Sequence, residues 1–196
     1  MNLPNKLTVS RFILTVLFLA ALFPRSRLGD TLALVIFIAA GLTDLFDGRI
    51  ARRRKLITNF GILMDPLADK IMTCSAFIAF VDRDLMPAWM VVIIVARELA
   101  ITGLRLLAAS KNVVLAAEGF GKHKTVTQIV AIIAILVLVS YTGWGPAGRA
   151  VFGFPIWGTP WVELFTTAAI WLTVVLTFVS GGLYLWRNRD LYLHDV

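Results

Sequence analysis

Cysteine and histidine are almost absent from this 196-residue chain, which has one cysteine and two histidines. Cys74 lies in an apolar run and has no second cysteine to pair with, so an intramolecular disulfide is excluded and we expect a packing role. His123 and His194 are too few and too far apart to suggest a zinc site. Internal repeats and low-complexity segments are also missing, so the sequence does not suggest a repeat array.

Charged residues are scarce as well. They make up 16% of the chain, against 59% hydrophobic residues and a mean hydropathy of +0.83. This composition predicts one integral membrane domain over residues 1–196 rather than a soluble protein. The net charge is +7, but the basic residues cluster beside apolar segments instead of forming a stripe. We therefore expect contacts with membrane lipids and phosphorylated substrates, and no nucleic-acid partner.

The apolar runs predict an all-α integral membrane protein with six transmembrane helices and a short N-terminal interfacial helix. The predicted helices cover residues 7–23, 31–53, 61–81, 87–109, 124–141 and 161–186. Only the last two approach the uncharged length needed to cross ~30 Å of hydrocarbon, so the first four must continue into a polar, protein-lined zone. No small-residue cleavage site follows the first apolar run, so we expect that helix to be retained. Residues 143–160 resemble an outer loop with interfacial aromatics.

The distribution of lysine and arginine predicts the orientation. With both termini in the cytoplasm, only four basic residues fall in outer loops: Arg25, Arg27, Arg83 and Arg149. The excess on the inner side agrees with the positive-inside rule. The predicted orientation places several charged residues at one level near the inner leaflet. The sequence therefore predicts a polar cavity that opens to the cytoplasm and a dry outer half.

Four of the twelve acidic residues lie between Asp44 and Asp69. On a helix, Asp44 and Asp47 share a stripe of roughly 140° with three residues that follow them. These three are Gly48, Ala51 and Arg52. Gly61, Asp65 and Asp69 are spaced four apart and share one face of the next helix. Two helices that meet on these faces would bring four carboxylates together.

Four carboxylates in a low-dielectric site repel one another and cost several kcal/mol or more to bury without partners. Two divalent cations would cancel their formal charge, and all-oxygen ligands favour Mg²⁺ or Mn²⁺. The small residues Gly48, Ala51 and Gly61 leave room for a ligand near the backbone. Acidic caps at a cytoplasmic loop would explain two of these aspartates, but not four on converging faces.

The spacing of this stretch resembles the signature of the CDP-alcohol phosphotransferase family at every fixed position. The resemblance implies transfer of a phosphatidyl-type group from a CDP-linked donor to an acceptor alcohol, with release of CMP. It also implies a metal-dependent enzyme of the bacterial inner membrane, whose active site faces the cytoplasm, and a homodimer. By position, Asp44, Asp47, Asp65 and Asp69 would hold the metal ions, and Asp69 would also be the general base.

The resemblance extends to residues expected to contact the CDP-lipid donor. These are Asn5, Thr8, Arg11, Gly48, Ala51, Arg52, Thr58 and Gly61. For Arg11, an equal alternative is that its side chain extends to lipid headgroups at the membrane surface.

The second half of the chain is most like the bacterial phosphatidylglycerophosphate synthases within this family. The matching residues are Arg97, Glu98, Thr102, Gly103, Arg105, residues 121–125 and residues 65–70. Those synthases use CDP-diacylglycerol and glycerol 3-phosphate, so the acceptor phosphate needs cations. Arg97 and Arg105 lie about 80° apart around a helix and can both point inward. Lys122 and Lys124 begin the next helix and could add a contact.

Alternatives remain open at these basic residues. Arg97 and Glu98 could form a structural ion pair, and Lys122 and Lys124 could bind headgroups. For the whole chain, a cardiolipin synthase is the nearest alternative, since it would use phosphatidylglycerol as the acceptor. A cation-coupled transporter is a more distant one, because intramembrane acids also mark ion pathways. Gathering the charges at one level argues against alternating access.

Overall fold

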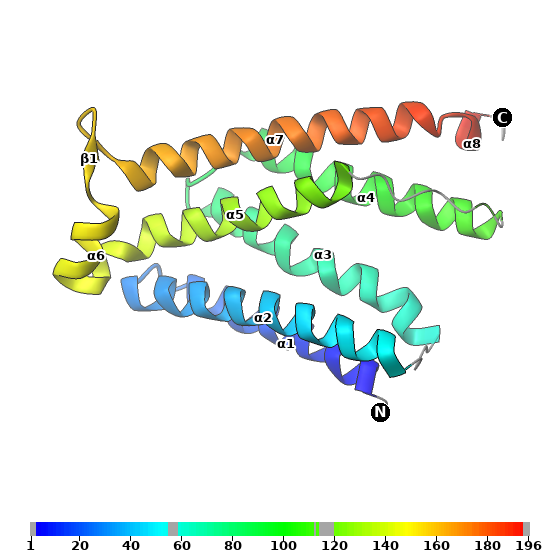
Figure 1. The fold of residues 1–196 in the computed structure, drawn as a ribbon, viewed down its shortest axis with the longest axis horizontal. Coiled ribbons are helices and arrows are strands. Elements are labelled where there is room, and N and C mark those ends of the chain that lie inside the picture. Colours follow the sequence, from blue (N-terminus) through cyan, green and yellow to red (C-terminus); the bar gives the residue numbers. More distant parts are fainter. Residues whose placement is uncertain (1–2, 55–58, 112, 114–119, 194–196) are drawn as a thin grey trace.

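A computed structural model describes residues 3–54, 59–111, 113 and 120–193. Within these ranges only the backbone is described for residues 3–8, 43–54, 59–69, 120–123, 190 and 193. The fold consists almost entirely of helices (Figure 1).

Six long helices form the body of the molecule. They are α1 (Leu3–Leu22), α2 (Arg27–Arg54), α3 (Asn59–Asp82), α4 (Ala88–Ser110), α5 (Phe120–Ser140) and α7 (Trp161–Arg187). The six predicted helices are therefore confirmed as helices. Two segments, Lys124–Phe152 and Trp161–Arg187, are long and apolar enough to cross a membrane by length and composition within the described part of the chain. These are the same two regions for which the sequence predicts a full apolar span.

The predicted separate interfacial helix is wrong, because α1 runs without a break from Leu3 to Leu22. Pro4 falls in the first turn of α1, where a missing backbone N–H removes no helical hydrogen bond. Thr15 lies within the same helix and donates its hydroxyl to the carbonyl of Arg11 at 2.9 Å. The first helix thus presents Asn5, Thr8 and Arg11 on one continuous element.

The predicted outer loop has secondary structure of its own. It contains the 3₁₀ helix η1 (Tyr141–Trp144), α6 (Gly145–Phe152) and a hairpin of β1 (Pro155–Ile156) and β2 (Thr159–Pro160). Trp157 and Gly158 have positive φ angles of 52° and 86°, as the two-residue turn of a tight hairpin requires. Aromatic side chains pack along this segment, where the Phe152 ring lies 5.9 Å from that of Trp161.

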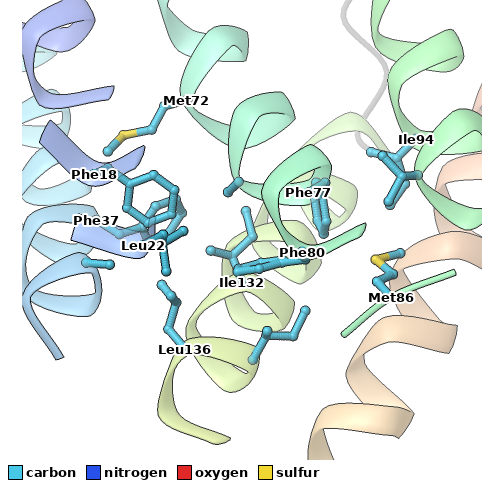
Figure 2. Close-up of a cluster of buried hydrophobic side chains, with 14 of the residues drawn as sticks. Phe18, Leu22, Phe37, Met72, Phe77, Phe80, Met86, Ile94, Ile132 and Leu136 are labelled. Atoms are coloured by element: carbon cyan, nitrogen blue, oxygen red, sulfur yellow. The ribbon is translucent and has the colours of Figure 1, made fainter. Parts of the chain in front are cut away.

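The six long helices pack around one core, to which α4 contributes Ile94 and α7 contributes Val174. α4 and α7 also pack against each other. Figure 2 shows this core, in which Phe18, Phe77, Phe80 and Ile132 have no exposed surface. Close packing of these side chains fixes the relative positions of the helices.

The chain reverses direction several times, so that several helix ends lie toward the same end of the molecule (Figure 1). The start of α1, the connected ends of α2 and α3, and the last turns of α4 and α7 point toward that end, and α6 and the hairpin lie at the opposite end. A helix of 27 residues such as α7 is about 40 Å long. The molecule therefore has the length of a membrane with its interfacial regions.

The end with the hairpin also carries a buried charge pair. Arg83 donates two hydrogen bonds to the Asp30 carboxylate, one of them over 3.1 Å, and the two side chains are 12% and 4% exposed. Arg83 is one of the four basic residues that the sequence predicts for the outer loops, and the prediction of a dry outer half stays a prediction. The pair joins the start of α2 to the end of α3, and each charge compensates the other.

We predict that Asp30→Asn lowers the free energy of unfolding by about 3–5 kcal/mol, because the variant leaves the Arg83 guanidinium buried without its counter-ion. Thermal unfolding in detergent micelles measures the effect. Asp82→Asn is the matched control, because the Asp82–Arg25 pair is 3.0 Å long but largely exposed; its loss should cost less than about 1 kcal/mol. Equal losses in the two variants would contradict this account.

Candidate functional site

The four predicted metal-binding aspartates lie at matching heights on two connected helices. Asp44 and Asp47 are in the last part of α2, and Asp65 and Asp69 are in the first part of α3. Asp47 and Asp65 are each about 10 Å along the axis from the connected helix ends, and Asp44 and Asp69 are each about 15 Å away. Figure 1 shows these ends of α2 and α3 close together. The backbone therefore allows the two pairs of aspartates to approach one another.

The side chains of these four aspartates lie outside the described residues, as do the side chains of Asn5, Thr8, Arg52 and Lys122. Thr58 lies outside them altogether. Gly48, Ala51 and Gly61 are placed on α2 and α3 through their backbone. Arg11 is half-buried on α1, which packs against both α2 and α3.

A second group of charges is described in atomic detail, and its centre is Glu98 on α4. The Glu98 carboxylate contacts three cations: Lys124 from α5, Arg97 over 3.5 Å, and Lys70 from α3 over 3.6 Å. Gln128, one turn after Lys124, donates to the same carboxylate at 3.3 Å. We call these five residues the Glu98 cluster.

The Glu98 cluster is largely buried. Glu98 and Lys124 expose 7% and 4% of their side chains, Arg97 exposes 13%, and Lys70 exposes 27%. Lys70 also donates to the Glu98 carbonyl at 3.2 Å and contacts the hydroxyl of Thr102. Because Lys70 directly follows Asp69, the cluster is tied to the helix that carries two of the predicted metal ligands.

Arg97 fits over a glycine of α7. A Cβ atom at Gly181 would lie 2.6 Å from the Arg97 Cγ, so only glycine allows this approach without displacing the arginine. The Arg97 Nε is buried and has no hydrogen-bond partner among the described residues, and the same holds for the Thr177 hydroxyl one turn before Gly181. A buried guanidinium N–H without a hydrogen-bond partner costs free energy.

Arg105 lies two turns after Glu98 on α4 and is exposed. Its guanidinium is 5.7 Å from the centre of the Tyr184 ring, and its Nε donates to the Tyr184 hydroxyl at 3.4 Å. Tyr184 is itself buried with Ile101 and Leu104. This contact directs Arg105 along α7 on the same side of α4 as Arg97.

Two of the four predicted acceptor-binding residues, Arg97 and Lys124, are thus brought together, and Arg105 lies nearby on α4. The ion pair between Arg97 and Glu98, which the sequence left open as an alternative, is present. Sequence reasoning did not single out Lys70, Gln128 or Tyr184. The first two carry a signal: Lys70 adjoins Asp69, and Gln128 lies one helical turn from Lys124.

Three cations around one carboxylate leave the Glu98 cluster with a net charge of +2. In a partly buried site such an excess of cations attracts anions strongly, and arginine and lysine together match the oxygens of a phosphate. The Glu98 cluster is therefore suited to bind an anionic group close to the level of Asp69.

The predicted aspartates also fit a divalent metal by the chemistry of their donor atoms. Four carboxylates provide only hard oxygen ligands, which suit Mg²⁺ and Mn²⁺. Among the side chains that the structure describes, no three acids, histidines or cysteines come together as a metal site. The aspartates of α2 and α3 stay the metal ligands that the sequence predicts.

Comparison with known proteins defines the class. The family model for CDP-alcohol phosphatidyltransferases matches residues 1–179. The chain belongs to the CDP-alcohol phosphatidyltransferase family.

Alignments with relatives in this family cover most of each chain. It is 38% identical to the CDP-diacylglycerol–glycerol-3-phosphate 3-phosphatidyltransferase of Bacillus subtilis, over 96% of each chain. It is 30% identical to the protein of the same name from Rickettsia felis, over 93% of each chain. It is also 41% identical to a probable phosphatidylglycerophosphate synthase of Mycobacterium tuberculosis, over 67% of this chain and 64% of that protein.

We predict that Gly181→Ala lowers the free energy of unfolding by about 1–3 kcal/mol, because the added methyl group overlaps the Arg97 side chain. Gly182→Ala is the control, since a Cβ there meets nothing within 4 Å; it should be neutral or stabilising by up to about 1 kcal/mol through helix propensity. Thermal unfolding of the two variants measures the difference. Equal stabilities would show that Arg97 does not pack against Gly181.

Proposed function

We propose that this chain is a membrane enzyme that transfers the phosphatidyl group of CDP-diacylglycerol to glycerol 3-phosphate. The products are phosphatidylglycerophosphate and CMP. The observation that carries the proposal is the Glu98 cluster, a buried group of cations next to the helix of Asp65 and Asp69. An acceptor that bears a phosphate needs such cations, and relatives over almost the whole chain are named for this reaction.

The surface supports a membrane location. Large apolar side chains stand exposed on the outside of the helices, among them Val16 (65%), Val92 (64%) and Phe178 (66%). In water this surface would promote aggregation, whereas lipid tails solvate it. Trp157 and Trp186 are exposed near opposite ends of the molecule, where indole side chains favour the two membrane interfaces.

We assign the end with the charged helix segments to the cytoplasm, so that both termini and the active site face it. A bacterial inner membrane is the corresponding compartment. By family resemblance the enzyme is a homodimer. The donor would contact α1, α2 and α3 through the residues predicted from the sequence: Asn5, Thr8, Arg11, Gly48, Ala51, Arg52, Thr58 and Gly61.

The acceptor's phosphate would bind Arg97, Arg105 and Lys124, with Lys122 as a further candidate. This contact would direct the acceptor hydroxyl toward the aspartates of α2 and α3. Holding the two reactants in this geometry removes much of the entropic cost of their encounter. Lys70 would link the phosphate site to the helix of Asp69, which gives the acceptor a fixed position relative to the reacting hydroxyl.

In the transfer, the acceptor's hydroxyl oxygen attacks the phosphorus of the phosphatidyl group. The bond from this phosphorus to the oxygen that leaves with CMP breaks. Asp69 accepts the hydroxyl proton. Asp44, Asp47, Asp65 and Asp69 would hold two divalent ions, which when bound neutralise the diphosphate and stabilise the leaving group. The adjacent Arg52 would add positive charge toward the donor.

Purified protein given CDP-diacylglycerol, radiolabelled glycerol 3-phosphate and Mg²⁺ should form a labelled phospholipid and release CMP. Asp44→Asn and Asp65→Asn should lose activity at least about 100-fold, because each removes a charged metal ligand. Excess chelator should have the same effect on the wild type. Turnover that continues in chelator would contradict the metal assignment, and labelling only with phosphatidylglycerol as acceptor would favour a cardiolipin synthase.

Arg105→Ala should raise the KM for glycerol 3-phosphate about tenfold or more, because a charged hydrogen bond to the phosphate is worth about 1.5–3 kcal/mol. The KM for CDP-diacylglycerol should change less than about twofold. Arg149→Ala on α6, at the opposite end of the molecule, is the matched control and should leave both constants unchanged. Equal increases in the two constants for Arg105→Ala would point to a folding role instead.

A further inference from the structure

The three cations of the Glu98 cluster come from three different helices. Lys70 belongs to α3, Arg97 to α4 and Lys124 to α5, so the three residues are far apart in the sequence. Each of them approaches the same carboxylate within ion-pair distance. Without that carboxylate three like charges would repel one another in a partly buried site. Something must therefore hold them together before a substrate arrives.

We propose that Glu98 is a positioning residue that assembles the binding site for the acceptor's phosphate. This inference rests on the proposed function. Glu98 gathers Lys70, Arg97 and Lys124 at one point, and the phosphate binds to their remaining N–H groups. Glu98 itself does not touch the acceptor. Its effect on acceptor binding is exerted through the three cations.

The main chain around Glu98 reinforces this role. The Glu98 carbonyl accepts hydrogen bonds from Lys70 at 3.2 Å and from the Thr102 hydroxyl at 2.7 Å. Gln128 donates to the carboxylate from α5. These contacts fix the Glu98 side chain, and a fixed anion orders flexible lysine and arginine side chains in advance. Such preorganisation lowers the entropy that binding would otherwise lose.

The charge of the Glu98 cluster also suits one class of anion. The excess of cations over carboxylates favours a phosphomonoester, which carries about −1.5 to −2 near neutral pH. A phosphodiester carries a single negative charge and would neutralise less of the cluster's positive charge. Glu98 thereby favours glycerol 3-phosphate over a phosphodiester acceptor.

The test compares Glu98→Gln with Asp30→Asn, since both remove one buried carboxylate from an arginine. For Glu98→Gln we expect the KM for glycerol 3-phosphate to rise at least about tenfold, with a change of less than about twofold for CDP-diacylglycerol. Inhibition by inorganic phosphate should weaken by a similar factor. Asp30→Asn should lower the thermal midpoint without separating the two KM values. A uniform loss of activity in Glu98→Gln, without that separation, would overturn the inference.

Glu98→Asp keeps the carboxylate and tests the same point if the glutamine variant does not fold. It should restore much of the acceptor affinity and retain the preference for glycerol 3-phosphate over phosphatidylglycerol. An aspartate variant that loses the preference for glycerol 3-phosphate, or that raises the KM values of both substrates equally, would refute the positioning role.

Titration calorimetry with glycerol 3-phosphate separates this inference from the proposed function. If the wild type binds glycerol 3-phosphate and Glu98→Gln binds it more weakly, the phosphate site is supported. If the wild type also shows no turnover, only the proposed reaction is overturned. Normal turnover by the wild type together with unchanged binding in Glu98→Gln would overturn only the role of Glu98.

Discussion

The attraction between one buried carboxylate and three cations is the interaction on which the functional end of this protein depends. Glu98 joins α3, α4 and α5 through Lys70, Arg97 and Lys124. Each partner would be expensive to bury alone, and together they form a site with excess positive charge. The helix that supplies Lys70 also supplies Asp65 and Asp69. The same ion network therefore stabilises the packing of the helices and sets the proposed acceptor site beside the aspartates.

The apolar exterior imposes the complementary constraint. The helices carry large exposed hydrophobic side chains along their length, so charged groups are tolerated only inside the bundle or toward its ends. Both arrangements occur here. The Glu98 cluster lies inside the bundle, where Glu98 and Lys70 are near the middle of α4 and α3, and the buried Asp30–Arg83 pair lies toward the end with the hairpin. The two networks differ in charge: Asp30 and Arg83 cancel each other, whereas the Glu98 cluster has more cations than carboxylates, and this excess is the reason for proposing a ligand site there.

The helices could be predicted because apolar runs of this length have few alternatives. The assignment of the aspartates as metal ligands, which follows from their spacing on a helical face and from a family signature, stays a prediction. The contacts between helices could not be predicted. Glu98 becomes the centre of a cluster only after α3 and α5 pack against α4, and nothing in the residues around Lys70 or Gln128 specifies that partner. Asp30 and Arg83 are far apart in the sequence and pair for the same reason. The sequence predicts a short interfacial helix before residues 7–23, whereas α1 is continuous from Leu3, since Pro4 in its first turn is compatible with a helix.

The account's central claim is that the cations gathered by Glu98 bind the phosphate of the acceptor. A structure of the protein in lipid with glycerol 3-phosphate bound tests this claim most directly. The account predicts phosphate oxygens within hydrogen-bond distance of Arg97, Arg105 and Lys124, with the acceptor's free hydroxyl directed toward Asp69. A phosphate bound elsewhere, with the Glu98 cluster unchanged and free of ligand, would contradict it.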